Sequence, residues 1–210
     1  MPRVSWRKAA EELATRDRKL RAVMLKAGPP RHRGPDPDGH FGALLRAIVF
    51  QQLAGKAASA IHGRVRALVD GDLTPDAMLA LSEKQLRGAG LSNNKYLAVR
   101  DLAAKVADGT VELGRVSKLS DEDLIAELIT VRGIGRWTAE MFLMFELRRL
   151  DVWPVDDLGV QAGYGLMHGI DRPTARQLAP LGDAYRPYRS VAAWYCYEAV
   201  HLSRGEVTPR

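Results

Sequence analysis

The feature that most constrains the fold is a series of apolar segments with helical spacing, several of them opened by a residue that favours a helix start. Thr74, Ser92 and Ser120 stand before three such segments, where a hydroxyl can accept hydrogen bonds from the first N–H groups of a helix. Runs that alternate apolar and polar residues around Asn-Gly turns, the mark of β-hairpins, are sparse. The sequence therefore predicts an all-α fold without internal repeats.

The predicted helices are separated by recognisable breaks. A chain of 210 residues can form one compact body or two small lobes. The longest break is a Pro- and Gly-rich stretch from Gly28 to Gly39, and Gly55 is a candidate break inside a long apolar segment. We expect helices over residues 7–26, 41–70, 82–87, 92–107, 136–148, 172–178 and 190–202, with others beginning at Thr74 and Ser120. A further helix should begin at Asp156 or Asp157 and end near Met167.

Composition limits the partners and cofactors. The formal net charge of +6 and the pI of about 9.6 suit a polyanionic partner, although they also fit plain solubility. A single cysteine, Cys196, cannot form an internal disulfide, a four-cysteine iron–sulfur cluster or a cysteine-rich zinc site, and the five histidines lack metal-ligand spacing. Because the chain shows neither a signal segment nor an apolar run long enough for a bilayer, we expect a cytoplasmic protein without membrane contact.

The most informative segment is the stretch from Leu128 to Ala139. A predicted helix ends there, Gly133 and Gly135 follow with one residue between them, and a second helix begins. Glycines let backbone N–H groups approach a ligand, and the start of a helix presents unpaired N–H groups and a positive dipole end. The segment therefore fits a phosphate cradle, but an ordinary turn between two helices uses the same residues.

The flanking residues add a family resemblance. Residues 131–139 (VRGIGRWTA) resemble the helix-hairpin-helix of the DNA glycosylase superfamily that includes endonuclease III, and are most similar to the 3-methyladenine DNA glycosylase II branch. Residues 47–58 (AIVFQQLAGKAA) resemble the Gln-Gln helix of that branch, and residues 155–157 and 185–190 follow in the expected order. The resemblance runs from about residue 20 to residue 202.

The resemblance implies a two-lobed helical core over residues 1–210, with a DNA-binding cleft between the lobes. One lobe would take up about residues 41–150, including the hairpin at 128–139, and the other about residues 1–40 and 151–210. The chain is too short for the additional N-terminal α/β domain of the best-known bacterial member. The expected partner is damaged double-stranded DNA, bound by a monomer associated with the nucleoid.

The implied activity is that of a monofunctional DNA glycosylase, which hydrolyses the N-glycosidic bond of flipped alkylated purines of the 3-methyladenine and 7-methylguanine type. Positive charge develops on the sugar, so one carboxylate can stabilise the transition state or position water. The catalytic position of the family matches Asp157, while Asp156 is expected to cap the helix or orient its neighbour. Bifunctional relatives carry a lysine where this chain has Trp137, so we expect no strand cleavage.

The resemblance also implies roles for other residues, although core aromatics and solvated cations are the ordinary explanations of the same residue types. The expected base pocket consists of Trp137, Met141, Tyr197 and Trp194. The expected wedge is Gln52 or Leu53, which would fill the gap left by the flipped base. The expected DNA contacts are Gly133, Gly135, Arg136, Thr138, Lys56 and Arg189. A Na⁺ or K⁺ ion is expected on the backbone carbonyls of Ile129, Val131 and Ile134.

Three other functions are compatible with the sequence. The chain could act on other damaged bases, such as deaminated or oxidised ones, within the same family. A helix-hairpin-helix module that binds DNA without catalysis would need neither Asp157 nor Trp137. A helical protein–protein adaptor would bind its partner with little dependence on salt, unlike a protein that contacts phosphates.

Overall fold

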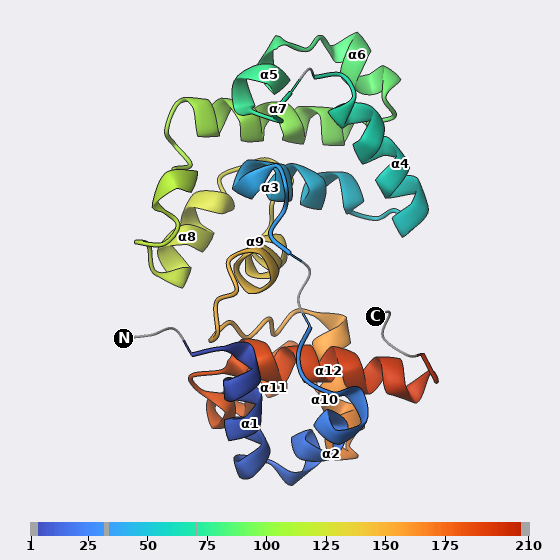
Figure 1. The fold of residues 1–210 in the computed structure, drawn as a ribbon, viewed down its shortest axis with the longest axis vertical. Coiled ribbons are helices and arrows are strands. Elements are labelled where there is room, and N and C mark those ends of the chain that lie inside the picture. Colours follow the sequence, from blue (N-terminus) through green and yellow to red (C-terminus); the bar gives the residue numbers. More distant parts are fainter. Residues whose placement is uncertain (1–3, 32–33, 70, 207–210) are drawn as a thin grey trace. The chain divides into compact units, whose positions relative to one another are not determined.

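The all-α prediction is confirmed by the computed structural model, which describes residues 4–31, 34–69 and 71–206. All regular elements in these ranges are helical (Figure 1). The chain divides into two compact units, which we call the inserted unit (residues 34–146) and the terminal unit (residues 1–33 and 147–210). Over the described residues, no helix combines the length and apolar character that crossing a bilayer requires.

The inserted unit is built around α3, which is buried on the side that faces its neighbours. Leu44, Leu45 and Ile48 of α3 are fully buried, and α3 packs against α4, α7 and the π-helical turn η2 (Figure 1). The unit contains α3 (Gly39–Phe50), α4 (Gly55–Arg66), α5 (Pro75–Ala80), α6 (Glu83–Gly88), α7 (Asn93–Ala107), the 3-10 turn η1 (Leu113–Arg115), α8 (Asp121–Leu128), α9 (Arg136–Met141) and η2 (Phe142–Glu146).

The predicted helix starts in this unit are confirmed. The hydroxyl oxygen of Thr74 accepts a hydrogen bond from the Ala77 N–H at 3.2 Å, and that of Ser120 accepts one from the Asp123 N–H at 3.2 Å. Ser92 caps α7 in the same way. The long apolar segment forms two helices, and Gly55 is the first residue of the second. Local capping chemistry therefore sets the starts of α5, α7 and α8.

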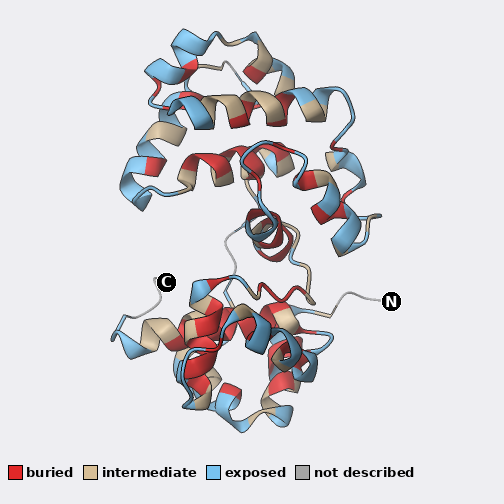
Figure 2. Ribbon diagram, turned by 180° about the vertical axis from the view of Figure 1, so that it is seen from behind, coloured by how far each residue is buried: buried red, intermediate tan, exposed pale blue. Residues whose placement is uncertain are grey.

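The terminal unit is organised by α12, which packs along α10 and also contacts α1 and α2. Every residue of α12 from Ser190 to Cys196 is buried, and Figure 2 shows the buried residues of the unit gathered on the facing sides of its helices. Gly163 permits the close approach of α10, because a Cβ there would lie 1.9 Å from the Cys196 carbonyl oxygen. The unit contains α1 (Trp6–Arg16), α2 (Arg18–Ala27), α10 (Leu158–His168), α11 (Ala175–Leu181), η3 (Gly182–Tyr185) and α12 (Arg189–Ser203).

The prediction of one continuous helix over residues 7–26 is wrong, because the helix breaks at Asp17. This residue has an extended backbone (φ −127°, ψ 109°), and its carboxylate accepts hydrogen bonds from the N–H groups of Lys19 and Leu20. Asp17 thus ends α1 and caps α2. An aspartate side chain competes with helical hydrogen bonding in this way, which apolar spacing alone does not reveal.

Two other expected helices differ in their bounds. The α-helix predicted over residues 136–148 ends at Met141 and continues as η2 through Glu146. The helix predicted over residues 172–178 is shifted toward the C-terminus, because Thr174 and Gln177 form a reciprocal capping box that starts α11 at Ala175.

Candidate functional site

The two-glycine turn joins α8 to α9 in the inserted unit, as the sequence predicts. Gly133 has a φ of +80°, a conformation that residues with a Cβ rarely adopt, and Gly135 is the N-cap of α9. Val131 and Ile134 are buried, and the Ile134 N–H donates to the Val131 carbonyl at 3.0 Å. The turn is therefore anchored in the core by its apolar residues.

The two-glycine turn is also held from α7 by an aspartate that sequence reasoning missed. Oδ2 of Asp101 accepts hydrogen bonds from the Arg132 N–H at 2.7 Å and from the Lys105 ammonium at 2.9 Å. Burial alone would raise the pKa of Asp101, but these hydrogen bonds outweigh it and lower the pKa. The i,i+4 spacing of Asp101 and Lys105 was the available signal, although it could not show that the pair contacts the turn.

The expected monovalent cation stays a prediction. The Val131 carbonyl already accepts the Ile134 N–H, and the Thr130 carbonyl, between two of the predicted ligands, accepts a hydrogen bond from Lys105. An ammonium group on this part of the turn makes an additional cation nearby less favourable. Across the described residues, no cluster of three or more His, Cys, Asp or Glu side chains could hold a metal ion either.

A pocket of about 580 Å³ opens between the end of α3 and the start of α9. It brings together three of the residues expected in the base pocket or the wedge, Trp137, Met141 and Gln52, whereas Leu53 does not line it. Trp137 is 46% exposed, so its ring is accessible to a ligand. The full lining is Ala47, Phe50, Gln51, Gln52, Trp137, Thr138 and Met141.

Asp157 is the N-cap of α10 in the terminal unit. Its Oδ1 accepts a hydrogen bond from the Val160 N–H at 2.8 Å, and the residue is only 6% exposed. The expectation that Asp156 caps this helix is wrong, because Asp156 lies exposed in the preceding turn. One carboxylate oxygen of Asp157 is therefore fixed by the backbone, as a catalytic carboxylate requires.

Tyr197 lies beside Asp157, while its expected role in the base pocket stays a prediction. A Cβ on Gly159 would lie 2.8 Å from the Tyr197 ring and 3.0 Å from Oδ1 of Asp157, so both side chains border this glycine. The thiol of Cys196 is buried nearby, and burial together with the negative charge of Asp157 raises the pKa of Cys196. Trp194, in contrast, is 7% exposed and packs edge-on against Tyr195, as a core residue does.

Two of the expected DNA contacts are already engaged in ion pairs. Arg136 forms a bidentate pair with Glu122, at 2.6 and 3.0 Å, and its Nε donates to the buried Glu140 at 3.1 Å. Arg189 pairs with Asp151, with its Nε 2.8 Å from Oδ1. A phosphate would have to share or displace these carboxylates, so the two DNA contacts stay predictions.

The remaining expected DNA contacts differ in accessibility. Lys56 is exposed on the first turn of α4. Thr138 is 6% exposed and its Oγ1 accepts a hydrogen bond from the Gln51 amide at 3.3 Å, so its contact with DNA stays a prediction.

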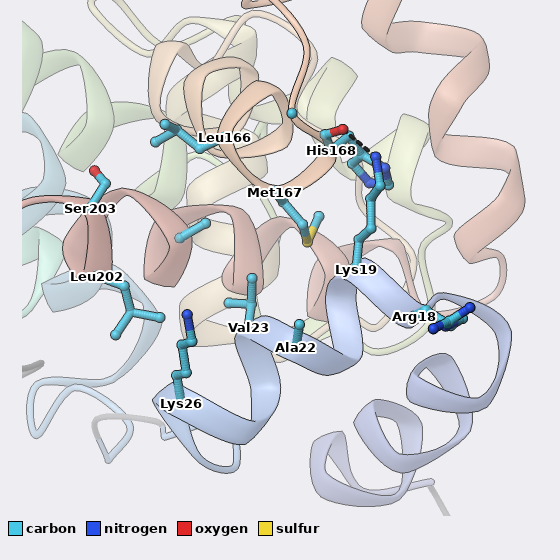
Figure 3. Close-up of a pocket in the computed structure, with 12 residues that line it drawn as sticks. Arg18, Lys19, Ala22, Val23, Lys26, Leu166, Met167, His168, Leu202 and Ser203 are labelled. Atoms are coloured by element: carbon cyan, nitrogen blue, oxygen red, sulfur yellow. Dashed lines mark hydrogen bonds between the residues drawn. The ribbon is translucent and has the colours of Figure 1, made fainter.

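A second groove, of about 820 Å³, lies within the terminal unit and contains none of the expected site residues. It is bordered by α2, by the C-terminal end of α10 and by the end of α12, with Arg18, Lys19 and Lys26 around it (Figure 3). Lys19 donates a hydrogen bond to the His168 carbonyl across one side of the groove. This groove and Asp157 lie at opposite ends of α10.

Comparisons with known proteins found a matching family model and similar proteins. The family model described as "HhH-GPD superfamily base excision DNA repair protein" matches residues 45–183. DNA-3-methyladenine glycosylase 1 of Schizosaccharomyces pombe is 32% identical over 187 residues, which are 87% of this chain and 82% of that protein.

Two solved structures resemble the whole chain. A Schizosaccharomyces pombe 3-methyladenine DNA glycosylase in complex with abasic DNA has a TM-score of 0.82 and 30% identity, covering 97% of this chain and 100% of that one. A Bacillus halodurans DNA-3-methyladenine glycosidase has a TM-score of 0.84 and 34% identity, covering 95% and 93%. The matched residues include the Gln-Gln segment, the two-glycine turn and Asp157, so the resemblance inferred from the sequence is confirmed. This chain belongs to the HhH-GPD superfamily of base excision DNA repair proteins.

Proposed function

We propose that this protein is a monofunctional DNA glycosylase that removes N-alkylated purines, such as 3-methyladenine and 7-methylguanine, from duplex DNA. The observation that carries the proposal is the fixed carboxylate of Asp157, buried at the start of α10 and held by the Val160 N–H. A helix-hairpin-helix module that only binds DNA would need this residue only as the cap of α10, a task that serine or asparagine performs as well. The names of the related glycosylases support the same activity.

Asp157 would act on the sugar. When the N-glycosidic bond breaks, its electron pair goes to the cationic purine, which leaves as a neutral base, and C1′ of the sugar becomes positively charged. The Asp157 carboxylate stabilises this charge, and water then adds to C1′ and gives up a proton to the carboxylate or to solvent. An alkylated purine is a good leaving group, so a single carboxylate is sufficient.

Trp137 and Met141 would hold the flipped base. A cationic purine stacks favourably on an electron-rich indole ring, and a methionine sulfur adapts to the edge of a planar ligand. Gln52, which lines the same pocket, is the proposed wedge in preference to Leu53. The position of Trp137 also bears on the reaction type, because an indole cannot form the Schiff base that a lyase requires.

The proposed partner is damaged duplex DNA, as in the complex of the Schizosaccharomyces pombe relative with abasic DNA. The net charge of +6 and the exposed Lys56 support a polyanionic partner. We further propose that the protein acts as a monomer, in the cytoplasm and associated with the nucleoid.

The experiment is a panel of duplexes, each with one modified base: 7-methylguanine, hypoxanthine, uracil or 8-oxoguanine, together with randomly methylated DNA and an undamaged control. We expect release of methylated purines, with strands that stay intact until alkali cleaves the abasic site. Strand cleavage without alkali would contradict the monofunctional assignment. Release confined to deaminated or oxidised bases would replace the substrate class, and binding without release of any base would leave only a DNA-binding module.

A further inference from the structure

The turn between α3 and α4, residues 51–54, is held in an unusual conformation. Gln52 has a φ of +56°, in the left-handed region that residues with a Cβ enter only at an energetic cost. Its side chain is exposed, as is that of Leu53. Such a conformation persists only where the surroundings enforce it. We call residues 51–54 the wedge turn, after the role proposed for Gln52.

The first support of the wedge turn comes from Lys95, on α7. Its ammonium group donates hydrogen bonds to the Val49 carbonyl at 2.6 Å and to the Gln51 carbonyl at 2.8 Å. These carbonyls belong to the last turn and the C-cap of α3, where a helix lacks partners for its oxygens and presents the negative end of its dipole. Partial burial lowers the pKa of Lys95, so the charged ammonium is held at this position at a cost.

The second support comes from the Gln51 side chain. Its amide nitrogen donates to the Gly133 carbonyl at 2.9 Å and to Oγ1 of Thr138 at 3.3 Å. One amide thus connects the wedge turn to the two-glycine turn and to α9, which carries Trp137. The wedge turn, the two-glycine turn and the wall of the 580 Å³ pocket are therefore tied together inside one unit.

We propose that Lys95 and Gln51 are positioning residues for base extrusion. They hold Gln52 in its left-handed conformation, so that its side chain is already in place when the target base leaves the stack. A wedge that is ordered before binding loses little conformational entropy when it enters DNA. A mobile wedge would lose that entropy during base flipping, which makes flipping less favourable. This inference rests on the proposed function.

If Lys95 and Gln51 position the wedge, their effect depends on how firmly the target base is paired. Extruding a well-paired base costs more than extruding a mispaired one, and the wedge stabilises the extruded state. Loss of Lys95 or Gln51 should therefore slow excision most where the target base is well paired. A residue needed only for general folding would slow excision equally on both substrates.

The test uses single-turnover excision of 7-methylguanine placed opposite cytosine or opposite thymine. Lys95→Met keeps the aliphatic stem but removes the donors, and Gln51→Asn keeps the amide but is too short to reach the Gly133 carbonyl. We expect the excision rate of each variant to fall about tenfold when 7-methylguanine lies opposite cytosine, which corresponds to the loss of about one hydrogen bond. Opposite thymine, the rate should stay near that of the wild type. Lys95→Arg, which retains donors, should recover part of the loss.

Arg100→Met provides a matched control. Arg100 is also on α7, and its guanidinium likewise donates to helix-end carbonyls, those of Met78, Leu79 and Leu81, but it does not touch the wedge turn. We expect its effect to be the same on both duplexes. Thermal unfolding identifies any variant that fails to fold. If Lys95→Met does not fold, the rates of Gln51→Asn on the two duplexes still test the positioning role.

A fluorescence readout separates this inference from the proposed function. In an Asp157→Asn background, 2-aminopurine next to the lesion brightens on unstacking without any excision, and the brightening should weaken in Lys95→Met and Gln51→Asn. Equal losses on the two duplexes, or wild-type rates and brightening in both variants, would overturn the positioning role. Absence of base release by the wild type on either duplex would instead reject the proposed function.

Discussion

The Asp157 side chain caps α10 and also supplies the proposed catalytic carboxylate. Its Oδ1 accepts the Val160 N–H as the cap of α10, and the residue is buried beside Gly159 and Tyr197. The sequence predicted a helix start and a catalytic carboxylate at this point, but it assigned the cap to Asp156. Both aspartates suit an N-cap by residue type, and only packing against α12 decides which of them is buried.

Replacement of Trp137 tests the proposed base pocket at the level of a single residue. Because its side chain is 46% exposed, Trp137→Ala should change the free energy of unfolding by less than about 1 kcal/mol. Loss of the stacking surface should slow excision of 7-methylguanine from duplex DNA by roughly 10- to 100-fold. Leu25→Ala, which removes an apolar side chain that is 75% exposed in the terminal unit, is the control and should leave the rate unchanged. An unaltered rate in Trp137→Ala would remove this residue from the pocket.

At the scale of elements, the features that could be predicted are those encoded within one helical turn. The caps at Thr74, Ser92 and Ser120 follow from a hydroxyl and the N–H groups three residues ahead. The contacts from Lys95 to the end of α3 could not be predicted, because these residues are more than 40 positions apart in the chain. The break at Asp17 was local, yet missed, because apolar spacing continues across it.

The close packing of α10 on α12 leads to a second prediction. Gly163→Ala should destabilise the protein by about 3 kcal/mol or more, because the new Cβ would meet the backbone carbonyl of Cys196, which cannot move aside as a side chain would. Gly63→Ala is the control, since a Cβ on this exposed α4 residue meets nothing within 4 Å; it should leave stability unchanged or raise it by up to about 1 kcal/mol. Chemical denaturation gives both values, and similar stabilities for the two variants would refute the packing argument.

Asp17 leads to a third prediction, about pH. Burial alone would raise its pKa, but hydrogen bonds from the Tyr185 hydroxyl and from the N–H groups of Lys19 and Leu20 lower it below its ordinary value of 3.8. The stabilisation by the charged carboxylate is therefore fully present above about pH 4 and is lost as the pH falls through the lowered pKa. Asp17→Ala should lose about 1 to 3 kcal/mol of unfolding free energy at pH 7.

The same variant should differ less from the wild type at pH 3 than at pH 7, as measured by denaturant unfolding at both pH values. Asp171→Ala, at an exposed aspartate of the terminal unit, is the control and should behave as the wild type. A constant difference between wild type and Asp17→Ala over this range would show that the charge of Asp17 contributes nothing.

At the scale of the whole molecule, the net charge of +6 does not show which cations are available to DNA. Arg136 and Arg189 are engaged by carboxylates, whereas Lys56 is exposed. The family could be inferred from motifs and their order, and the all-α class from helical spacing. The cleft expected between the lobes stays a prediction, because no local pattern determines how two units are arranged.

Salt dependence tests which cations contact phosphate. The affinity of catalytically inactive Asp157→Asn for duplex DNA should fall steeply with salt, with a log–log slope of about −0.9 for each phosphate contacted. Adding Lys56→Ala should make the slope shallower by about one unit, whereas adding Arg189→Ala should leave it unchanged, because Asp151 already neutralises that guanidinium. The reverse pattern would show that Arg189 leaves Asp151 to bind DNA.

A comparison of Asp157→Asn with Asp156→Asn shows whether the carboxylate at the start of α10 carries the chemistry. Asparagine caps a helix as well as aspartate does, so Asp157→Asn should fold normally, and the adjacent exposed aspartate is the matched control. In single-turnover release of 7-methylguanine from duplex DNA, we predict a loss of at least about 100-fold for Asp157→Asn and a rate near wild type for Asp156→Asn. A wild-type rate of release by folded Asp157→Asn would contradict the account.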